Sequence, residues 1–205
     1  MENFDELALT WDNEPKRIQR AKIVADEIMK AIPGLSEMSG LEYGCGTGLL
    51  SFFLQPRLKH ITVGDNSQGM LKVLTQKVEN AKIKNMSPVM LDLSEGAGIH
   101  GQYDIIYTLM TLHHIVDTDK VIDAFSRMLK TSGYLCIADL DKEDGSFHGE
   151  GFIGHNGFDQ EELTEKLEKY GFDQIKWKIC FENIRKSEDG TERKYPLFMM
   201  IGKRI

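Results

Sequence analysis

The 205-residue sequence lacks any long apolar run, because no stretch approaches the roughly 20 residues that a membrane-spanning helix needs. Its first 21 residues are charged and lack the apolar core of a secretory signal peptide. Internal repeats and low-complexity tracts are also missing, which excludes a solenoid and a disordered arm. We therefore expect a cytoplasmic protein without a membrane span.

Cysteine is scarce, and positive charge is in deficit. Cys45, Cys136 and Cys180 lie far apart along the chain, so no pair has the short spacing of a zinc or dithiol site, and we expect reduced thiols. Lys and Arg number 25 against 32 Asp and Glu, a formal net charge of −7. This balance disfavours binding to nucleic acid or to an anionic membrane. A small molecule is the partner that we expect.

Strands and helices alternate along the chain, which has enough hydrophobic residues, 41%, for one well-buried domain. Apolar spacing predicts helices over residues 14–32, 49–55, 67–81, 117–130 and 158–172. Strands are predicted over residues 40–43, 60–65, 88–93, 103–110, 133–140, 173–183 and 195–205. Strand–helix–strand units give a mainly parallel sheet with helices on both faces. The last two strands have no helix between them and can pair only as an antiparallel hairpin. The expected fold class is α/β, a doubly wound seven-stranded sheet.

The stretch "LEYGCGTGLLSFF" at residues 41–53 places three glycines in five positions between a strand and a helix. In an open parallel sheet the ligand crevice lies beyond the carboxyl ends of the strands, so residues 44–48 should line it. Glycine there accepts positive φ and lets a ligand approach the main chain. A dinucleotide fingerprint, G-x-G-x-x-G, is not matched, since its third glycine position holds Leu49 or Ser51. A Rossmann-type dinucleotide or nucleotide-sugar enzyme is thus disfavoured.

The pattern E-x-G-x-G-x-G, from Glu42 to Gly48, resembles motif I of the class I S-adenosylmethionine-dependent methyltransferases. The chain is similar to the small bacterial-type members grouped with the ubiquinone and menaquinone biosynthesis enzymes. The resemblance implies a Rossmann-like methyltransferase fold that binds S-adenosyl-L-methionine and releases S-adenosyl-L-homocysteine. We expect one domain, 1–205, with an N-terminal lid segment and helix (1–35), a cofactor-binding core (36–140), and a substrate-side loop, helix and hairpin (141–205).

The resemblance also implies cofactor contacts at successive strand ends. Asp65, about twenty residues beyond the turn, is expected to accept hydrogen bonds from the ribose hydroxyls. Asp92 is expected to receive the adenine amino group. Taken singly, Asp92 and Met70 also fit a turn cap and a core residue, but their joint occurrence at strand ends favours the cofactor role. The expected cofactor residues are Trp11, Glu42, Gly44, Cys45, Gly46, Gly48, Asp65, Asn66, Met70, Asp92, Leu93, Thr108 and Leu109.

The acceptor side is expected to contain histidines. Methyl transfer from a sulfonium depends mainly on positioning, but an acceptor that must lose a proton favours a nearby His as the base. His113, His148 and His155 follow the fourth and fifth strands and are the catalytic candidates. The adjacent side chains of His113 and His114 should point apart, and no metal is expected. Residues 147–159, rich in glycine and aromatic side chains, should fold over the cleft.

The sequence therefore favours a single-domain methyltransferase that acts on a small-molecule acceptor by in-line displacement, as a monomer or a homodimer. A catalytically silent domain that binds S-adenosylmethionine as a sensor or partner subunit stays open, because this chemistry has no obligatory catalytic signature. The acceptor atom, whether oxygen, nitrogen, carbon or sulfur, and the use of a general base also stay open.

Overall fold

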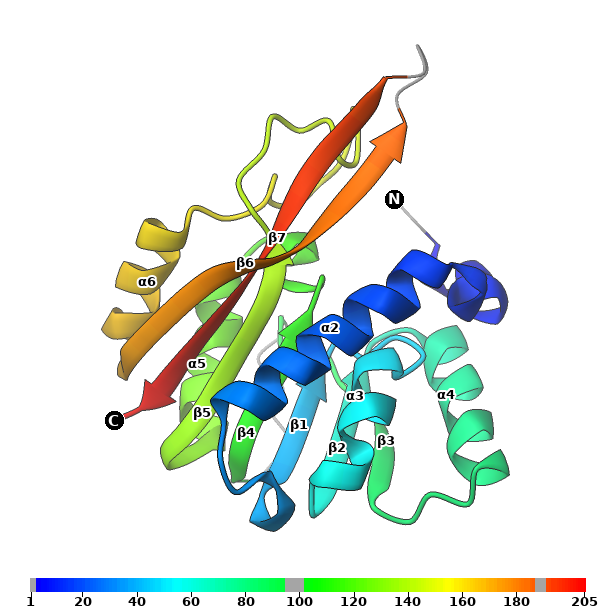
Figure 1. Ribbon diagram of the computed structural model, residues 1–205, viewed down its shortest axis with the longest axis vertical. Helices are drawn as coiled ribbons and strands as arrows, with labels where there is room; N and C mark the ends of the chain where they lie inside the picture. Colours follow the sequence, from blue (N-terminus) through cyan, green and yellow to red (C-terminus); the bar gives the residue numbers. More distant parts are fainter. Residues whose placement is uncertain (1–2, 95–101, 187–190) are drawn as a thin grey trace.

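The computed structural model describes residues 3–94, 102–186 and 191–205 and is built around a seven-stranded sheet in the order β3-β2-β1-β4-β5-β7-β6 (Figure 1). The strands are β1 (Ser39–Tyr43), β2 (His60–Asp65), β3 (Met86–Met90), β4 (Tyr103–Leu109), β5 (Leu129–Leu140), β6 (Phe172–Lys186) and β7 (Glu192–Arg204). Strands β1 to β5 pair in parallel, whereas β7 pairs antiparallel with both β5 and β6. The predicted sheet and its C-terminal hairpin are confirmed, with β6 at the edge.

Helices cover both faces of the sheet. They are α1 (Phe4–Leu7), α2 (Pro15–Ala31), α3 (Leu49–Leu54), α4 (Gln68–Asn80), α5 (Thr118–Met128) and α6 (Gln160–Lys169). Short 3-10 turns connect them at η1 (Ala8–Asn13), η2 (Leu35–Glu37), η3 (Gln55–Arg57) and η4 (Leu112–His114). Figure 1 shows α2, α3 and α4 on one face and α5 and α6 on the other. Among the described residues, no helix has both the length and the apolar character that a bilayer span requires.

Local sequence sets the helix ends. Pro15 occupies the first turn of α2, where its missing N–H removes no helical hydrogen bond. The Ser67 hydroxyl accepts a hydrogen bond from the Met70 N–H at the start of α4, as the sequence predicts. Asp159 caps α6 in the same way, and Gly171, with a φ of +80°, follows its end. Removing one such N-cap costs about 1 kcal/mol.

Two apolar layers hold the helices to the sheet. Burying one leucine or isoleucine side chain stabilises the fold by about 1.5–3 kcal/mol, so these layers make the sheet a rigid platform. The layer under α2, α3 and α4 includes Val24, Ile28, Leu50, Leu54 and Leu74. The layer under α5 and α6 includes Ile106, Val121, Phe125, Leu163 and Phe198.

Several strand ends differ from the sequence prediction. Strand β3 begins at Met86, which is buried and pairs with Ile61, so the strand lies two positions earlier than expected. Strand β5 begins at Leu129 because the end of α5 continues directly into it. Both hairpin strands are longer than predicted. Part of the polar turn that joins them, residues 187–190, lies outside the described residues.

The carboxyl ends of β1, β2, β4 and β5 lie together at one end of the sheet, where the strands terminate. Three further segments reach that edge in Figure 1. They are the N-terminal segment with α1 and η1, the long connection between β5 and α6, and the distal part of the β6–β7 hairpin. This is the edge at which open α/β sheets bind their ligands.

Candidate active site

A cavity of about 440 Å³ opens at this edge of the sheet. Small-molecule sites have volumes of roughly 300–1,000 Å³, so it is large enough for one. It extends from Glu42 and Asp65 at the ends of β1 and β2 to His113, His148 and Arg185 on the far side. We call these two regions the donor end and the acceptor end.

The glycine turn forms the floor of the donor end. Gly44, Gly46 and Gly48 all have positive φ, at +68°, +53° and +82°. A Cβ atom on Gly44 would lie 2.1 Å from Cγ2 of Thr111, so no larger residue fits there without a shift. The Thr111 hydroxyl donates a hydrogen bond of 3.2 Å to the Gly44 carbonyl. The turn is thereby fixed against the segment that follows β4.

Asp65 ties the glycine turn to the end of β2. Its carboxylate accepts the N–H of Gly46 at 2.7 Å and the N–H of Ser67 at 2.9 Å. Burial raises the pKa of Asp65 above its usual value, although these hydrogen bonds act in the opposite direction. A buried carboxylate beside an open main-chain turn suits a ligand that offers hydroxyl donors, as a ribose does.

Glu42 is the second carboxylate of the donor end. It is buried at the base of the cavity, and its Oε2 atom accepts the N–H of Ser51 at 3.1 Å. Burial raises its pKa to about 8. The donor end therefore places two carboxyl groups beside the glycine turn.

The N-terminal segment packs over the donor end. The Asp5 carboxylate accepts hydrogen bonds from the Ser67 hydroxyl at 2.6 Å and from the Gly69 N–H at 2.7 Å. Trp11 of the same segment lines the cavity, and its ring contacts Phe4 in an edge-on arrangement at 5.9 Å. These contacts place the segment where the sequence predicted a lid.

The cavity collects most, but not all, of the expected cofactor residues. Those on its wall are Trp11, Glu42, Gly44, Cys45, Gly46, Asp65, Asn66, Met70 and Leu109. Four expected residues lie off the wall. Gly48 lies under Leu74 at the start of α3, and Leu93 lies in the core. Thr108 is buried within β4. Its neighbour Leu109 lines the cavity, and successive side chains of a strand point to opposite faces of the sheet. Asp92 follows the end of β3, and its carboxylate accepts a hydrogen bond from the Asn66 side chain at 3.2 Å.

A buried His–Asp pair lies at the acceptor end. Nδ1 of His113 is 2.5 Å from Oδ1 of Asp139, near the end of β5, and both side chains are almost fully buried. Burial alone would raise the pKa of Asp139, but the charge and hydrogen bond of His113, together with the N–H of Leu140, bring it below its usual value. When the ring is neutral, an ionised Asp139 accepts its Nδ1–H, and the lone pair then lies on Nε2. Nε2 is buried and has no partner within the described part of the chain.

Two more histidine rings pack against this pair. The ring centroid of His114 lies 4.2 Å from that of His113, and the centroid of His148 lies 5.1 Å from it. The expectation that the adjacent histidines point apart is thus wrong, because both rings turn toward the same cavity. Burial, followed by the neighbouring imidazoles, lowers the pKa of His114 to about 3. Burial lowers that of His148 to about 4, so both rings are neutral near pH 7.

His155 does not belong to this cluster. Its Nε2 lies 3.3 Å from the carbonyl oxygen of Val116, and its ring packs on Phe158 rather than on the cavity. Its main chain nevertheless supports the site, since the His155 N–H donates to the His113 carbonyl at 2.7 Å. The connection between β5 and α6 contributes Phe147 and Phe152 to the wall, as predicted for residues 147–159.

Sequence reasoning missed the arginines of the cavity. Arg17 and Arg20 of α2 and Arg185 of β6 all line the cavity. The spacing of Arg17 and Arg20 places both on one face of a predicted helix, which was an available signal. Nothing in the sequence connects that face with Arg185. The two elements meet through a 2.9 Å hydrogen bond from Arg20 to Asn183, 163 positions away.

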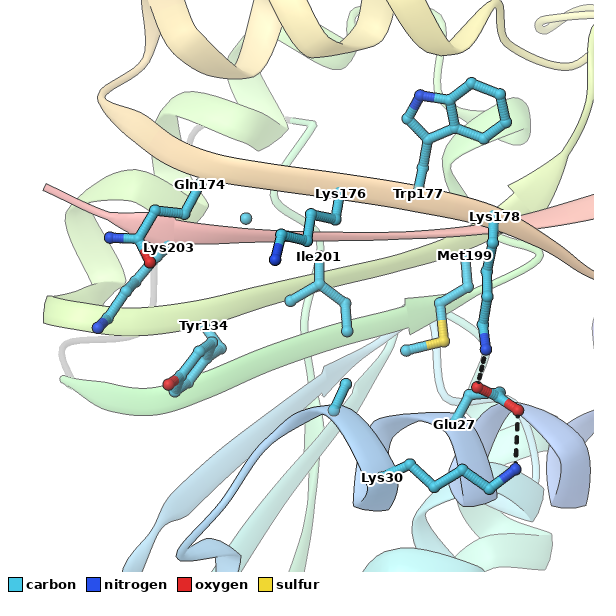
Figure 2. A pocket seen from close by; sticks show the side chains of 12 residues that line it. Glu27, Lys30, Tyr134, Gln174, Lys176, Trp177, Lys178, Met199, Ile201 and Lys203 are labelled. Atoms are coloured by element: carbon cyan, nitrogen blue, oxygen red, sulfur yellow. Dashed lines mark hydrogen bonds and ion pairs between the residues drawn. The ribbon is translucent and has the colours of Figure 1, made fainter.

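A second hollow, of about 500 Å³, lies between α2 and the outer strands of the sheet. Figure 2 shows Glu27 between the amino groups of Lys30 and Lys178. Hydrogen bonds from Lys178 and Lys30 lower the pKa of Glu27 below its usual value. Unlike the first cavity, its described lining contains no buried polar side-chain atom without a partner. The carboxylate of its lining, Glu27, is already paired, and we assign the active site to the cavity at the strand ends.

Comparison with known proteins agrees with this geometry. A family model described as a methyltransferase domain matches residues 16–177. The chain is 33% identical over 176 residues to an uncharacterised methyltransferase of Schizosaccharomyces pombe, covering 77% of this chain and 62% of that protein. It is 30% identical over 115 residues to a ubiquinone biosynthesis O-methyltransferase of Marinobacter nauticus, covering 55% and 48%. The matches thus span about half to three fifths of these relatives.

The fold is also shared with a solved structure. The N-methyltransferase NodS of Bradyrhizobium japonicum, crystallised with S-adenosyl-L-homocysteine, superposes with a TM-score of 0.67 at 18% identity. The superposition covers 93% of this chain and 87% of that one. At this identity the likeness concerns the fold alone.

Proposed function

The chain belongs to the methyltransferase-domain family as a class I S-adenosylmethionine-dependent member, and we propose that it methylates a small molecule bound at the acceptor end. One observation carries the proposal. A single cavity joins the glycine turn and Asp65, at one end, to the buried His113–Asp139 pair at the other. Donor and acceptor bound in such a cavity are held in one orientation, which is the main source of catalysis in a displacement of this kind.

The donor end fits the cofactor of the family. Asp65 would accept hydrogen bonds from the ribose hydroxyls, and the main chain of residues 44–46 is open to close approach. Met70 and Leu109 supply apolar surface on the same wall. When bound, S-adenosyl-L-methionine supplies an electrophilic methyl carbon: the lone pair of the acceptor atom forms the new bond, and sulfur keeps the electron pair of the breaking C–S bond.

His113 is positioned to remove a proton from the acceptor. Asp139 holds the Nδ1–H of the ring, so Nε2 carries the lone pair that would take the proton of a hydroxyl, a thiol or an ammonium group. The imidazolium that forms would be stabilised by the Asp139 carboxylate. Proton removal raises the electron density of the acceptor atom as the methyl group arrives.

The aromatic side chains around His113 exclude water from the acceptor end. His148 stacks on Phe152 with a centroid separation of 3.8 Å, and His114 contacts Phe4 of the N-terminal segment at 5.4 Å. Neutral His114 and His148 rings form an apolar wall around the His113 nitrogen. We propose His148 as a wall residue and His113 as the base; His155 lies outside the cavity and has neither role.

Two measurements test the proposal. Calorimetric titration with S-adenosyl-L-methionine, S-adenosyl-L-homocysteine and NAD should show binding of the first two only; tight NAD binding without the others would contradict it. A radiolabelled methyl-transfer screen over phenols, quinols, amines and thiols should then yield at least one product. Cofactor binding without transfer to any member of a broad panel would favour the silent binding domain instead.

A further inference from the structure

Arg20 has a buried donor that is unpaired within the described part of the chain. Its Nη1 atom donates to Oδ1 of Asn183 at 2.9 Å, but its Nε atom is buried and has no partner among the described residues. A buried charged group with an unmade hydrogen bond is costly, so a ligand that fills this place gains free energy. Burial, followed by the charges of Arg17 and Arg185, lowers the pKa of Arg20 to about 10 even though Asp139 acts in the opposite direction.

Arg185 lies on the same side of the cavity. Its guanidinium carbon is 3.7 Å from the centroid of the Phe147 ring, and one of its N–H groups donates to the Phe147 carbonyl. Stacking on an aromatic ring and a carbonyl fixes the plane of the guanidinium without neutralising it. In the described part of the chain, neither Arg20 nor Arg185 forms an ion pair with a carboxylate.

Charge is distributed unevenly along the cavity. The carboxylates among its described lining residues, Glu42 and Asp65, both lie at the donor end. Arg20 and Arg185 line the acceptor end, and Arg17 lines the cavity beside Trp11, although the whole chain has a net charge of −7. Two carboxylates lie close to this end without lining the cavity: Asp139 is bonded to His113, and Oε2 of Glu143 accepts the Phe147 N–H at 3.0 Å. A basic pocket in an acidic protein attracts an anion selectively to that place.

We propose that the methyl acceptor carries an oxyanion, a carboxylate or a phosphate, that binds to the guanidinium groups of Arg20 and Arg185. Guanidinium matches both groups with paired N–H donors. The acceptor is compact, because the cofactor and the acceptor share a cavity of about 440 Å³. This inference rests on the proposed methyl transfer, and it adds the chemical class of the acceptor.

The three histidines offer an alternative ligand, a divalent metal. One nitrogen from each of His113, His114 and His148 lies within 4.8 Å of the others, and neutral imidazoles bind zinc. A dication would, however, stand beside the guanidinium groups of the same wall, and Asp139 already accepts a hydrogen bond from His113. The sign of the local charge therefore favours an anion.

The first experiment measures binding without turnover. Protein saturated with S-adenosyl-L-homocysteine is titrated calorimetrically with benzoate, benzamide, inorganic phosphate and zinc chloride. We expect benzoate or phosphate to bind, benzamide to bind at least tenfold more weakly, and Arg20→Gln and Arg185→Gln to lose the anion signal. Arg127→Gln is the matched control, since Arg127 is exposed on α5 and paired with Asp123 at 2.8 Å. Stoichiometric zinc binding with no anion binding would overturn the proposal in favour of a metal site.

The second experiment uses paired acceptors, each phenol, amine or thiol offered as its carboxylic acid, its phosphate ester and its amide. Wild-type KM should be at least tenfold lower for one anionic form than for the amide, and that form identifies the oxyanion. Arg20→Gln should abolish the preference while still methylating the amide. Equal KM values for acid, phosphate and amide would overturn the inference but leave methyl transfer intact. Arg20-dependent benzoate binding with no product from any acceptor would instead contradict the methyl transfer.

Discussion

The two ends of the cavity are built in different ways. The donor end comes from two neighbouring strand ends and one continuous turn, and it carries the buried carboxyl groups of Glu42 and Asp65. The acceptor end is assembled from α2, η4, the connection after β5, and β6, and it carries guanidinium and imidazole groups. Most residues of the donor end lie close together in the sequence, whereas the residues of the acceptor end are far apart in the sequence and are brought together by folding. A fold of this kind can keep one donor site while its acceptor changes.

The difference also appears in how each end is held. At the donor end, hydrogen bonds from the main chain of the turn fix Asp65, and Thr111 fixes Gly44. At the acceptor end, contacts between side chains hold the functional groups in place, as in the stacked Arg185–Phe147 and His148–Phe152 pairs. Substitutions should therefore separate the two ends, with effects on cofactor affinity at one and on turnover at the other.

The largest effect should come from His113→Gln. Loss of the proton acceptor should lower kcat by about 10²–10⁴-fold for acceptors that must lose a proton, because general base catalysis contributes that much. Affinity for S-adenosyl-L-methionine, measured by calorimetry, should change less than about twofold because His113 does not belong to the donor end. His155→Gln is the control and should leave both quantities unchanged. Unchanged turnover in His113→Gln, or an equal loss in His155→Gln, would contradict the assigned base.

Much of the donor end could be predicted from the sequence because its parts are local. The spacing of three glycines, followed by a carboxylate at the end of the next strand, gives Gly44, Gly46 and Asp65 directly. Asp92 and Leu93 illustrate the limit for strand bounds: β3 begins two residues earlier than predicted, so both follow the strand and are not among the described lining residues, and their cofactor role stays a prediction. A shift of this size cannot be read from apolar spacing over a five-residue strand.

The acceptor end could be predicted only in part. The loop histidines and aromatics were found because they follow strand ends, but Arg20 and Arg185 were not. Their proximity depends on the hairpin, in which β7 enters the sheet and β6 lies beside α2. The sequence held a signal for that order, since residues 197–200 are uniformly apolar and become buried, whereas β6 carries charged residues such as Lys178 and is exposed over most of its length. Side-chain packing of the histidines has no such signal.

Gly44→Ala should break the donor end and leave the acceptor end in place. The new Cβ must accept a positive φ, which costs about 1–2 kcal/mol, and must displace Thr111, which costs about 1–3 kcal/mol more. Urea denaturation should show a combined loss of about 2–5 kcal/mol in the free energy of unfolding. Cofactor binding should be lost. Gly34→Ala is the matched control, because Gly34 has a φ of +74° and open space around it, so only the backbone cost applies.

Replacement of Glu42 tests whether the buried carboxyl groups of the donor end oppose folding at alkaline pH. The folded-state pKa of about 8 lies above the ordinary value of 4.5 for a glutamate. The protonated form therefore stabilises the protein below about pH 4.5, and this contribution is lost as the pH rises through 8. Glu42→Gln keeps the acceptor for the Ser51 N–H and removes the titration. Its free energy of unfolding should match that of the wild type at pH 5 and exceed it at pH 8 by on the order of 2–4 kcal/mol. Glu37→Gln, at an exposed position, should follow the wild-type curve; parallel curves for Glu42→Gln would contradict the assignment.

The smallest expected effect is a difference in cofactor affinity between variants of Asp65 and Asp92, the two carboxylates that the sequence analysis assigns to the same cofactor. Asp65→Ala should weaken S-adenosyl-L-methionine binding by about 1–3 kcal/mol, since it strands hydrogen-bond donors of the ligand and of Gly46. Asp92→Ala should cost less than about 1 kcal/mol, because Asp92 is not among the described lining residues and contacts one of them, Asn66, through a 3.2 Å hydrogen bond. Isothermal titration of both variants measures the difference. An Asp92→Ala loss as large as that of Asp65→Ala would mean that the cofactor contacts Asp92 directly, so that the donor end extends past β3 as the sequence alone predicts.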